Sequence, residues 1–296
     1  MKKNHKLVWM LALSILLTTT NVFAEAKVIN QGNQQIKEMA LTFDDGYSVE
    51  KIRAIVSKLN QYNVKGTFFF VGSFMAAHKD IVREVEADGH MVVSHTFNHP
   101  DLTRMTDKGV VGEIENTKIA YEKATGTKIL PYMRPPYGAY NDRVLNLLGK
   151  NHDLYVVMWT IDTLDWKKLP ASTISNTVLS QAGNGKIVLM HTTQHVHTDE
   201  ALDDIITGLH AKGYNLVRID EMLAKLPESE RIASISDNVE VDPSTIPPST
   251  NEGQGEETTE PSDETEQQPE EQEQQPVVPP KKEKSKQLYR VLLSRK

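Results

Sequence analysis

The sequence predicts an α/β fold in which parallel strands joined by helices form a distorted (β/α) barrel of about seven strands. Short apolar runs alternate with segments of helical periodicity from residue 37 to about residue 226. Such alternation indicates parallel strands with right-handed crossovers, and the lack of a long gap favours a closed barrel over an open sheet. Unusual polar side chains follow directly after the apolar runs, as they do at the carboxyl ends of barrel strands.

Seven short apolar or β-branched runs are the predicted strands. Two of them, 67–71 and 155–159, are apolar almost throughout, which is typical of strands buried on both faces. The seven runs are residues 39–43, 67–71, 91–93, 132–134, 155–159, 187–190 and 215–217.

Between these runs, apolar residues recur at the three- and four-residue spacing of an amphipathic helix. The helix predicted at 49–60, for example, has Ile52, Ile55, Val56 and Leu59 on one face. Further helices are predicted around 81–85 and at 106–124, 141–148, 172–181, 200–212 and 219–226.

The first 24 residues have the pattern of a secretory signal peptide. A basic start precedes an apolar run at 7–17, and Val22-Phe23-Ala24 resembles a small-residue cleavage site. The apolar run is too short for a stable membrane span, although an uncleaved anchor is the alternative. We therefore expect a secreted, extracellular protein.

After the predicted domain the composition changes. Residues 251–280 hold ten acidic and no basic side chains, so this tail carries much of the net charge of −7. Its Pro, Glu and Gln content predicts disorder. The last residues, 281–296, are basic and partly apolar, and we expect them either to contact anionic wall polymer or membrane, or to be inert. The predicted parts are therefore 1–24 (signal peptide), 25–36 (N-terminal segment), 37–228 (barrel), 229–280 (acidic linker) and 281–296 (basic end).

The sequence contains no cysteine. A lipoprotein anchor, a disulfide framework and thiolate catalysis are thereby excluded, and any metal must be held by His, Asp or Glu. An exported protein without cysteine suits the surface of a Gram-positive-type bacterium, with cell-wall association as one expected form. No basic patch indicates nucleic acid, and a monomer is expected.

Two adjacent carboxylates, Asp44 and Asp45, end the first predicted strand. Neighbouring side chains of a strand point to opposite faces, so both reach one site only if the chain bends. Gly46 accepts positive φ and can supply the bend. Two close negative charges persist most easily around a cation or when one takes up a proton. The stretch predicts a metal, acid–base chemistry or both, against the simpler interpretation of an Asp-Asp-Gly turn.

Two imidazoles, His95 and His99, follow the third strand. On one helical turn, residues four apart share a face, so both can ligate one ion. With Asp45 they complete two imidazoles and one carboxylate, a common open set for a divalent cation. These ligand types favour zinc, with cobalt or nickel able to substitute.

Three further strand ends carry charged side chains. Arg134 precedes two prolines that stiffen the chain, which suits a fixed salt bridge to a carboxylate, the alternative being a surface arginine. Asp162 and Asp165 follow the fifth strand, and a carboxylate beside a histidine raises its pKa, as a general acid requires. His191 ends the sixth strand, where an ordinary core histidine is the alternative. Trp166 offers an apolar wall or a sugar-stacking surface.

These motifs, TFDDG, HTFNH, RPPYG, DTLDW and LMH, resemble in order and approximate spacing the five motifs of the NodB-homology polysaccharide deacetylases, carbohydrate esterase family 4. The resemblance covers roughly residues 37–226 and implies a distorted (β/α) barrel. It implies that Asp45, His95 and His99 are the metal ligands.

The resemblance also implies the remaining roles. Asp44 is the implied catalytic base, held by Arg134, and His191 the implied general acid, oriented by Asp165. The backbone N–H of Tyr137 is the implied oxyanion donor. Trp166 and Leu189 are expected to line an acetate pocket, and Pro135, Pro136 and Tyr137 to contact substrate.

The expected function is removal of the acetyl group from N-acetylglucosamine in a polysaccharide, most naturally peptidoglycan, with release of acetate. Chitin oligomers and acetylated xylan are alternative substrates. A non-catalytic glycan- or wall-binding barrel is an alternative of another class, and so is a chain whose main functional part is the tail.

Overall fold

A computed structural model describes residues 25–226 of the 296-residue chain. The signal peptide predicted at 1–24 and the segments predicted at 229–280 and 281–296 lie outside the described residues. Within residues 25–226, no helix is both long enough and apolar enough to cross a membrane.

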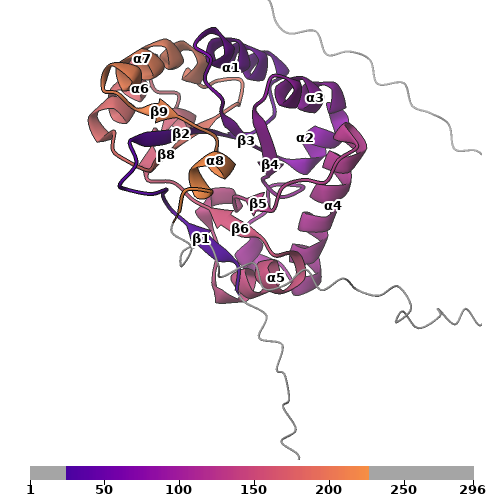
Figure 1. Cartoon of the computed structure of the whole chain (residues 1–296). Helices are drawn as coiled ribbons and strands as arrows, with labels where there is room; N and C mark the ends of the chain where they lie inside the picture. The colour runs from indigo at the N-terminus through magenta and orange to yellow at the C-terminus, as the bar shows by residue number, and fades with distance from the viewer. Residues whose placement is uncertain (1–24, 227–296) are drawn as a thin grey trace, which may run out of the picture. The chain divides into compact units, whose positions relative to one another are not determined.

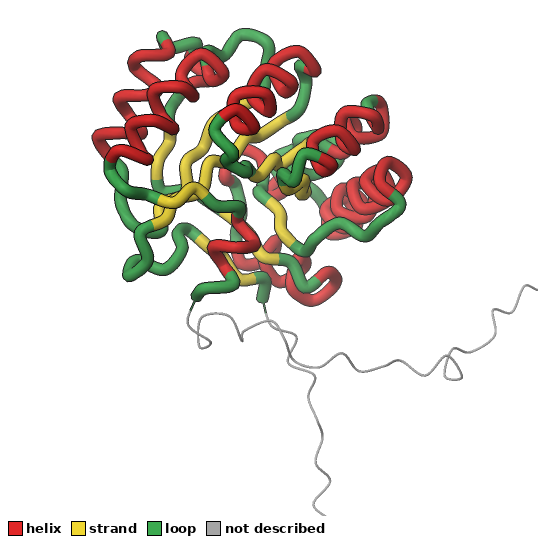
Figure 2. Tube along the Cα trace, turned by 45° about the horizontal axis from the view of Figure 1, so that its top comes forward, coloured by secondary structure: helices red, strands yellow, loops and turns green. Residues whose placement is uncertain are grey.

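A curled parallel sheet forms the centre of the domain, and most helices cover its outer side (Figures 1 and 2). The strand order is β1-β6-β5-β4-β3-β2-β8-β7, with β9 paired to β2, and every ladder is parallel. The strands are β1 (Lys27–Ile29), β2 (Glu38–Asp45), β3 (Thr67–Phe70), β4 (Met91–Ser94), β5 (Tyr132–Met133), β6 (Tyr155–Val157), β7 (Ile161–Asp162), β8 (Lys186–His191) and β9 (Asn215–Leu216).

Helices connect the strands as parallel pairing requires. They are α1 (Val49–Gln61), α2 (Gly72–Ala77), α3 (Lys79–Ala87), α4 (Asp107–Thr125), α5 (Asp142–His152), α6 (Ala171–Gln181), α7 (Thr198–Ala211) and α8 (Ile219–Leu223). The α/β class and the distorted barrel predicted from the sequence are therefore confirmed, and each of the seven predicted strands is present.

Three short elements were not predicted. β1 lies in the segment that precedes the predicted barrel and pairs with β6, β7 pairs with β8, and α2 directly follows β3. The sheet has nine strands instead of seven because β1 and β7 add an edge on each side. In the described part of the chain no ladder joins β1 to β7, so the barrel is a curled sheet with an open seam, and the closure favoured from the sequence was wrong.

Alternation along β2 separates an outer core from the interior of the curled sheet. Met39, Leu41 and Phe43 pack with the covering helices, whereas Ala40 belongs to a second cluster on the inner side. The ring of Phe69, from β3, lies in that inner cluster too. All eight residues of β2 are buried, so its carboxylates are presented from an enclosed strand of the sheet.

The short helix α8 covers the inner cluster at the amino ends of the strands (Figure 1). Its Ile219, Met222 and Leu223 are buried there, and the Ile219 N–H donates to Thr67 Oγ1 at 3.0 Å. With this end filled by side chains, access to the interior remains at the carboxyl ends of the strands.

We predict opposite effects for alanine at two glycines. A Cβ on Gly72, the first residue of α2, would lie 2.6 Å from Phe97 Cδ2 and 3.0 Å from the backbone Cα of Thr117. Gly72→Ala should therefore lower the free energy of unfolding by about 1–3 kcal/mol through overpacking.

The matched control is Gly112→Ala in α4, where nothing lies within 4 Å of the added Cβ. Better helix propensity should raise the free energy of unfolding by roughly 0.5–1 kcal/mol. Urea denaturation of both variants measures the two effects, and equal destabilisation would contradict the packing described here.

Candidate active site

The end of β2 places two neighbouring carboxylates on the same rim. Asp45 adopts a φ of 85° and Gly46 a φ of 123°, so strand alternation stops at Asp45 itself, one residue before the glycine that the sequence suggested for the bend. Thr192, from the end of β8, stabilises the turn. Its Oγ1 accepts from the Gly46 N–H at 2.8 Å and donates to the Asp44 carbonyl at 2.9 Å.

Asp44 forms a buried ion pair with Arg134. The Arg134 Nη1 lies 2.6 Å from Asp44 Oδ1, and the two side chains are 0% and 4% exposed. The predicted salt bridge is confirmed, and the surface alternative for Arg134 is excluded. This contact leaves the other carboxylate oxygen of Asp44 toward the imidazole of His95, at 3.8 Å from its Nε2.

Every nitrogen of the Arg134 guanidinium is used. Nε donates to the Val157 carbonyl at 2.9 Å, Nη2 to the Met158 carbonyl at 3.1 Å, and Nη1 also to Thr42 Oγ1 at 3.0 Å. The guanidinium carbon lies 4.1 Å from the centre of the Phe69 ring, a cation–π contact. Burial lowers the pKa of Arg134 and the charge of Asp44 opposes that effect.

His95 and His99 lie on a loop, and not on a helical turn. The helical explanation for their four-residue spacing was wrong: no helix spans residues 95–99, and Thr96 and His99 have φ values of 64° and 60°. Two left-handed residues turn the chain sharply enough to bring the imidazoles together, and the ring centroids are 4.9 Å apart.

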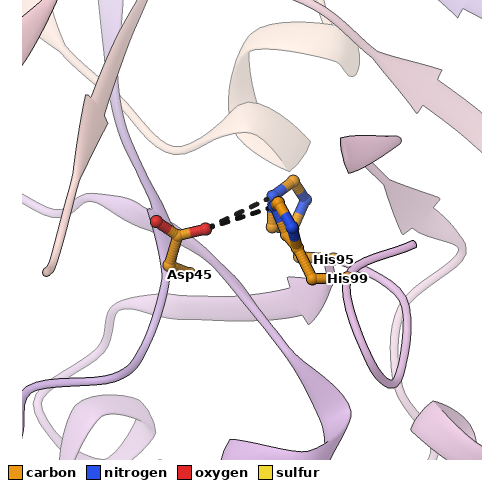
Figure 3. Close-up of side chains that lie close together, drawn as sticks. All are labelled: Asp45, His95 and His99. Carbon is orange, nitrogen blue, oxygen red and sulfur yellow. Dashed lines mark ion pairs between the residues drawn. The ribbon is translucent and has the colours of Figure 1, made fainter. Parts of the chain in front are cut away.

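Both imidazoles face one oxygen of Asp45 (Figure 3). Asp45 Oδ1 lies 3.7 Å from His95 Nε2 and 3.5 Å from His99 Nε2, and one ligand atom from each residue falls within 4.8 Å of the others. Ligands of a tetrahedral zinc ion at 2.0–2.2 Å are separated by roughly 3.3–3.5 Å, so the set fits such an ion with little adjustment.

The other ring nitrogens orient these ligands. His95 Nδ1 lies 2.8 Å from the Arg134 carbonyl and donates to it, which leaves the Nε2 lone pair for a cation. His99 Nδ1 lies 3.2 Å from the Tyr137 hydroxyl. Burial lowers the pKa of His95 to about 4 and lowers that of His99, so both rings are neutral at neutral pH.

Burial raises the pKa of Asp45 to about 6, with the charge of His191 opposing and that of Asp44 adding to the rise. A divalent cation would favour the ionised form of this carboxylate, and two neutral imidazoles beside it are suitable further ligands. The chemistry of the donor set and its geometry thus agree on a divalent metal.

Asp165 is fully buried beneath His191. Its Oδ1 lies 2.7 Å from His191 Nδ1, and its Oδ2 accepts from the His191 backbone N–H at 2.8 Å. Thr198 Oγ1 donates to the same Oδ2 at 2.5 Å, and the Trp166 backbone N–H donates to Oδ1 at 2.9 Å. Four donors therefore hold one carboxylate in a single orientation behind the imidazole.

The pKa of His191 results from two opposing effects. Burial lowers it, but the hydrogen bond and charge of Asp165, with the charges of Asp44 and Asp45, outweigh burial and raise it to about 9. His191 is therefore protonated at neutral pH and its Nε2–H is free to be donated, because Nδ1 is used by Asp165.

One cavity of about 480 Å³ brings these groups together. Of the predicted substrate-binding residues, Pro135, Tyr137, Trp166 and Leu189 line it, whereas Pro136 is buried and is not among the lining residues. The ring of Tyr137 is 72% exposed and its backbone has a φ of 60°. The full lining is Asp44, Asp45, His95, His99, Pro135, Tyr137, Gly138, Trp159, Asp162, Trp166, Leu189 and His191.

Several residues of the site were not singled out from the sequence. Trp159 lines the cavity although it ends an apolar run that predicted only a strand. Thr192 and Thr198 support Asp44 and Asp165 through single hydroxyls, for which no pattern in the sequence gives a signal. Glu113, on α4, accepts three hydrogen bonds from the loop that carries the imidazoles.

Comparison with known proteins gives a consistent result. Residues 31–157 match the family model described as polysaccharide deacetylase. The peptidoglycan-N-acetylglucosamine deacetylase PgdA of Listeria monocytogenes is 39% identical over 63% of this chain, and the matched region spans only 39% of that relative. The peptidoglycan-N-acetylglucosamine deacetylase of Bacillus cereus is 35% identical over 62% of this chain and 68% of its own length.

Solved structures agree with these relatives. The Bc1960 peptidoglycan N-acetylglucosamine deacetylase has a TM-score of 0.64 at 33% identity, over 67% of this chain and 92% of that one. BA3943 of Bacillus anthracis, a CE4 family pseudoenzyme, has a TM-score of 0.62 at 29% identity, over 66% of this chain and 68% of that one. On the motifs, the curled parallel sheet and these similarities, the chain belongs to the polysaccharide deacetylase family, the NodB-homology or carbohydrate esterase 4 family.

Proposed function

We propose that this chain is a secreted, metal-dependent polysaccharide deacetylase that hydrolyses the N-acetyl group of N-acetylglucosamine residues, with peptidoglycan as its substrate. One observation carries the proposal: in a single cavity a carboxylate base held by a buried arginine and an imidazolium acid held by a buried aspartate flank a three-residue cation site. Secretion rests on the signal-peptide pattern of residues 1–24.

Asp45, His95 and His99 would hold the metal ion. Two imidazoles and one carboxylate favour zinc, with cobalt or nickel able to replace it. A divalent ion at this position supplies polarisation of the acetyl carbonyl and a lower pKa for the attacking water.

Asp44 is the proposed base that takes the proton of this water. Its Oδ1 is occupied by Arg134 at 2.6 Å, so only Oδ2 is directed toward the cation site and the cavity. The salt bridge fixes the direction of the free lone pairs of Asp44, which orients the proposed base before substrate arrives.

The backbone N–H of Tyr137 is the proposed donor to the oxyanion of the tetrahedral intermediate. His191 then gives its Nε2 proton to the departing amine, which leaves poorly while unprotonated. Asp165 makes this step feasible at neutral pH because it keeps the imidazole charged and its Nε2 directed away from the buried side. Leu189 and Trp166 provide apolar walls for the acetyl methyl group.

Substrate choice is inferred from relatives. The Listeria and Bacillus cereus proteins, which are peptidoglycan-N-acetylglucosamine deacetylases by name, favour the same sugar for this chain. Chitin oligomers and acetylated xylan are the rival substrates, since the same cavity accepts any small acetyl group next to a sugar ring.

A non-catalytic glycan-binding barrel is the rival from another class. The similarity to a family pseudoenzyme makes this alternative concrete. Against it stand the proposed base, acid and all three cation ligands, which are present and lie together in this chain.

Acetate release decides between these functions. The full chain, loaded with zinc, is incubated with peptidoglycan, chitin oligomers and acetylated xylan, and released acetate is measured with and without a chelator. Chelator-sensitive release from peptidoglycan supports the proposal. Release from acetylated xylan alone would contradict the amide substrate, and glycan binding without any release would favour the non-catalytic barrel.

For the metal site, we predict that the wild-type chain binds one zinc ion. In Asp45→Asn the zinc affinity should fall by more than about 100-fold, a larger loss than is usual for residues that only orient metal ligands. Asp107→Asn, an exposed substitution on α4, is the matched control and should bind zinc like the wild type. Equilibrium dialysis with metal analysis measures both, and equal zinc binding by Asp45→Asn would reject the ligand set.

For the acid, we predict that His191 of the metal-free protein titrates near its pKa of about 9 in an NMR experiment. In Asp165→Asn the charge that raises this pKa is gone while burial remains, so the midpoint should fall to about 6.5 or lower. In the wild type, the Asp165–His191 pair makes its full contribution to the free energy of unfolding below about pH 6.5, and this contribution is lost as the pH rises through about 9. Asp199→Asn on α7 should leave the midpoint unchanged.

For catalysis, His191→Ala should lower kcat for acetate release by roughly 10²–10⁴-fold, because the amine would leave without a proton donor. His195→Ala, an exposed substitution on the loop that follows β8, should keep the wild-type rate. Initial rates at saturating substrate provide the measurement, and a His191→Ala rate near that of the wild type would exclude this histidine as the acid.

A further inference from the structure

The loop 95–99 holds both imidazoles of the proposed metal site in a conformation that is unfavourable for its own residues. Thr96 and His99 have φ values of 64° and 60°, and neither is a glycine. Left-handed backbone at a β-branched threonine costs free energy that the surroundings must offset. Contacts from outside the loop must therefore stabilise it.

Glu113 provides one set of these contacts. This residue of α4 is only 7% exposed, and its Oε2 accepts from the backbone N–H groups of Phe97 and Asn98 at 2.8 and 2.7 Å. Its Oε1 accepts from Asn98 Nδ2 at 3.0 Å. The carboxylate thus binds three donors at the tip of the loop, between the two imidazoles in sequence.

The start of α2 holds the same loop by its carbonyls. The Gly72 N–H donates to the Thr96 carbonyl at 2.8 Å, and the Ser73 N–H donates to the Phe97 carbonyl at 2.9 Å. Two backbone donors of the loop go to α4 and two backbone acceptors go to α2, while the Thr96 and His99 N–H groups bond to the Ser94 and Thr96 hydroxyls. Of the contacts from the two helices, those of Glu113 are the ones made by a side chain, and that side chain is a carboxylate.

We propose that Glu113 is a positioning residue of the metal site, whose carboxylate holds the 95–99 loop in the conformation that directs His95 and His99 at one ion. The inference rests on the proposed function only through this metal site and does not depend on the substrate. Glu113 is not among the residues that line the cavity.

The carboxylate is required because all three partners are donors. An amide at this position presents one acceptor oxygen and one NH₂ group, so when its oxygen accepts from the two backbone N–H groups its NH₂ faces the Asn98 NH₂, another donor. Glu113→Gln is therefore a nearly isosteric variant that replaces one acceptor with a donor and mispairs the contact to the Asn98 side chain. Glu122→Gln makes the same carboxylate-to-amide change at an exposed position nine residues further along α4, and it is the matched control.

The test measures the zinc affinity of the full chain by competition with a chromophoric chelator. We expect zinc binding by Glu113→Gln to weaken by about 10–100-fold, as for residues that orient metal ligands, while Glu122→Gln binds like the wild type. At saturating zinc, kcat for acetate release should recover most of its wild-type value, because the variant changes ligand placement and leaves base and acid untouched.

Other outcomes overturn the inference. If Glu113→Gln lowers the thermal stability of the metal-free protein but binds zinc with wild-type affinity, the residue is structural only. If Glu113→Gln does not fold, Asn98→Ala, which removes one of the three donors, decides: zinc binding about 3- to 10-fold weaker supports the role, and unchanged affinity rejects it. A wild-type chain that binds no zinc rejects the metal site itself, and with it this role.

Discussion

The buried ion pair of Asp44 and Arg134 is the constraint on which the site depends. A fully buried guanidinium is costly unless each donor has a partner, and this one uses a carboxylate, a hydroxyl and two backbone carbonyls. Removal of either charge would leave the other unpaired in the interior of the sheet, at a cost of about 3–5 kcal/mol. The pair fixes the position of the proposed base. It also holds the end of β6, because the Val157 carbonyl accepts from Arg134. The backbone carbonyl of Arg134 in turn orients His95.

The site holds each of its two proposed reacting groups by a buried side chain of opposite charge. On one side a buried cation holds a carboxylate, and on the other the buried Asp165 holds the imidazole of His191. Each reacting group therefore has one atom bound to the interior and one directed to the cavity. The proposed base and the proposed acid, whose pKa is raised, thus line one cavity together with the cation ligands.

Much of this arrangement could be predicted from the sequence because strand ends are visible as apolar runs followed by charged residues. The convergence of Asp44, Arg134 and His191 followed from that pattern. The structure shows the Asp44–Arg134 ion pair, and the β2–β8 register places His191 beside Asp44. β1 and β7 were not predicted, because β1 precedes the segment in which strands and helices alternate and β7 follows β6 without a helix between them. The left-handed turn at Thr96 was missed because a threonine gives no signal of positive φ. Glu113 was missed because helical periodicity does not distinguish an acidic residue that turns inward from its solvated neighbours.

The open seam of the sheet has a further consequence. Between β6 and β7 the chain itself crosses the gap: the Met158 N–H bonds to β1 and the Thr160 N–H to β8, while the carbonyls of Val157 and Met158 turn inward to Arg134. These two carbonyls thus bind the Arg134 guanidinium and not a neighbouring strand. Trp159, in the middle of the segment that links β6 to β7, forms part of the cavity wall. The segment that leads from β6 to β7 therefore both spans the open seam and binds the guanidinium that holds Asp44.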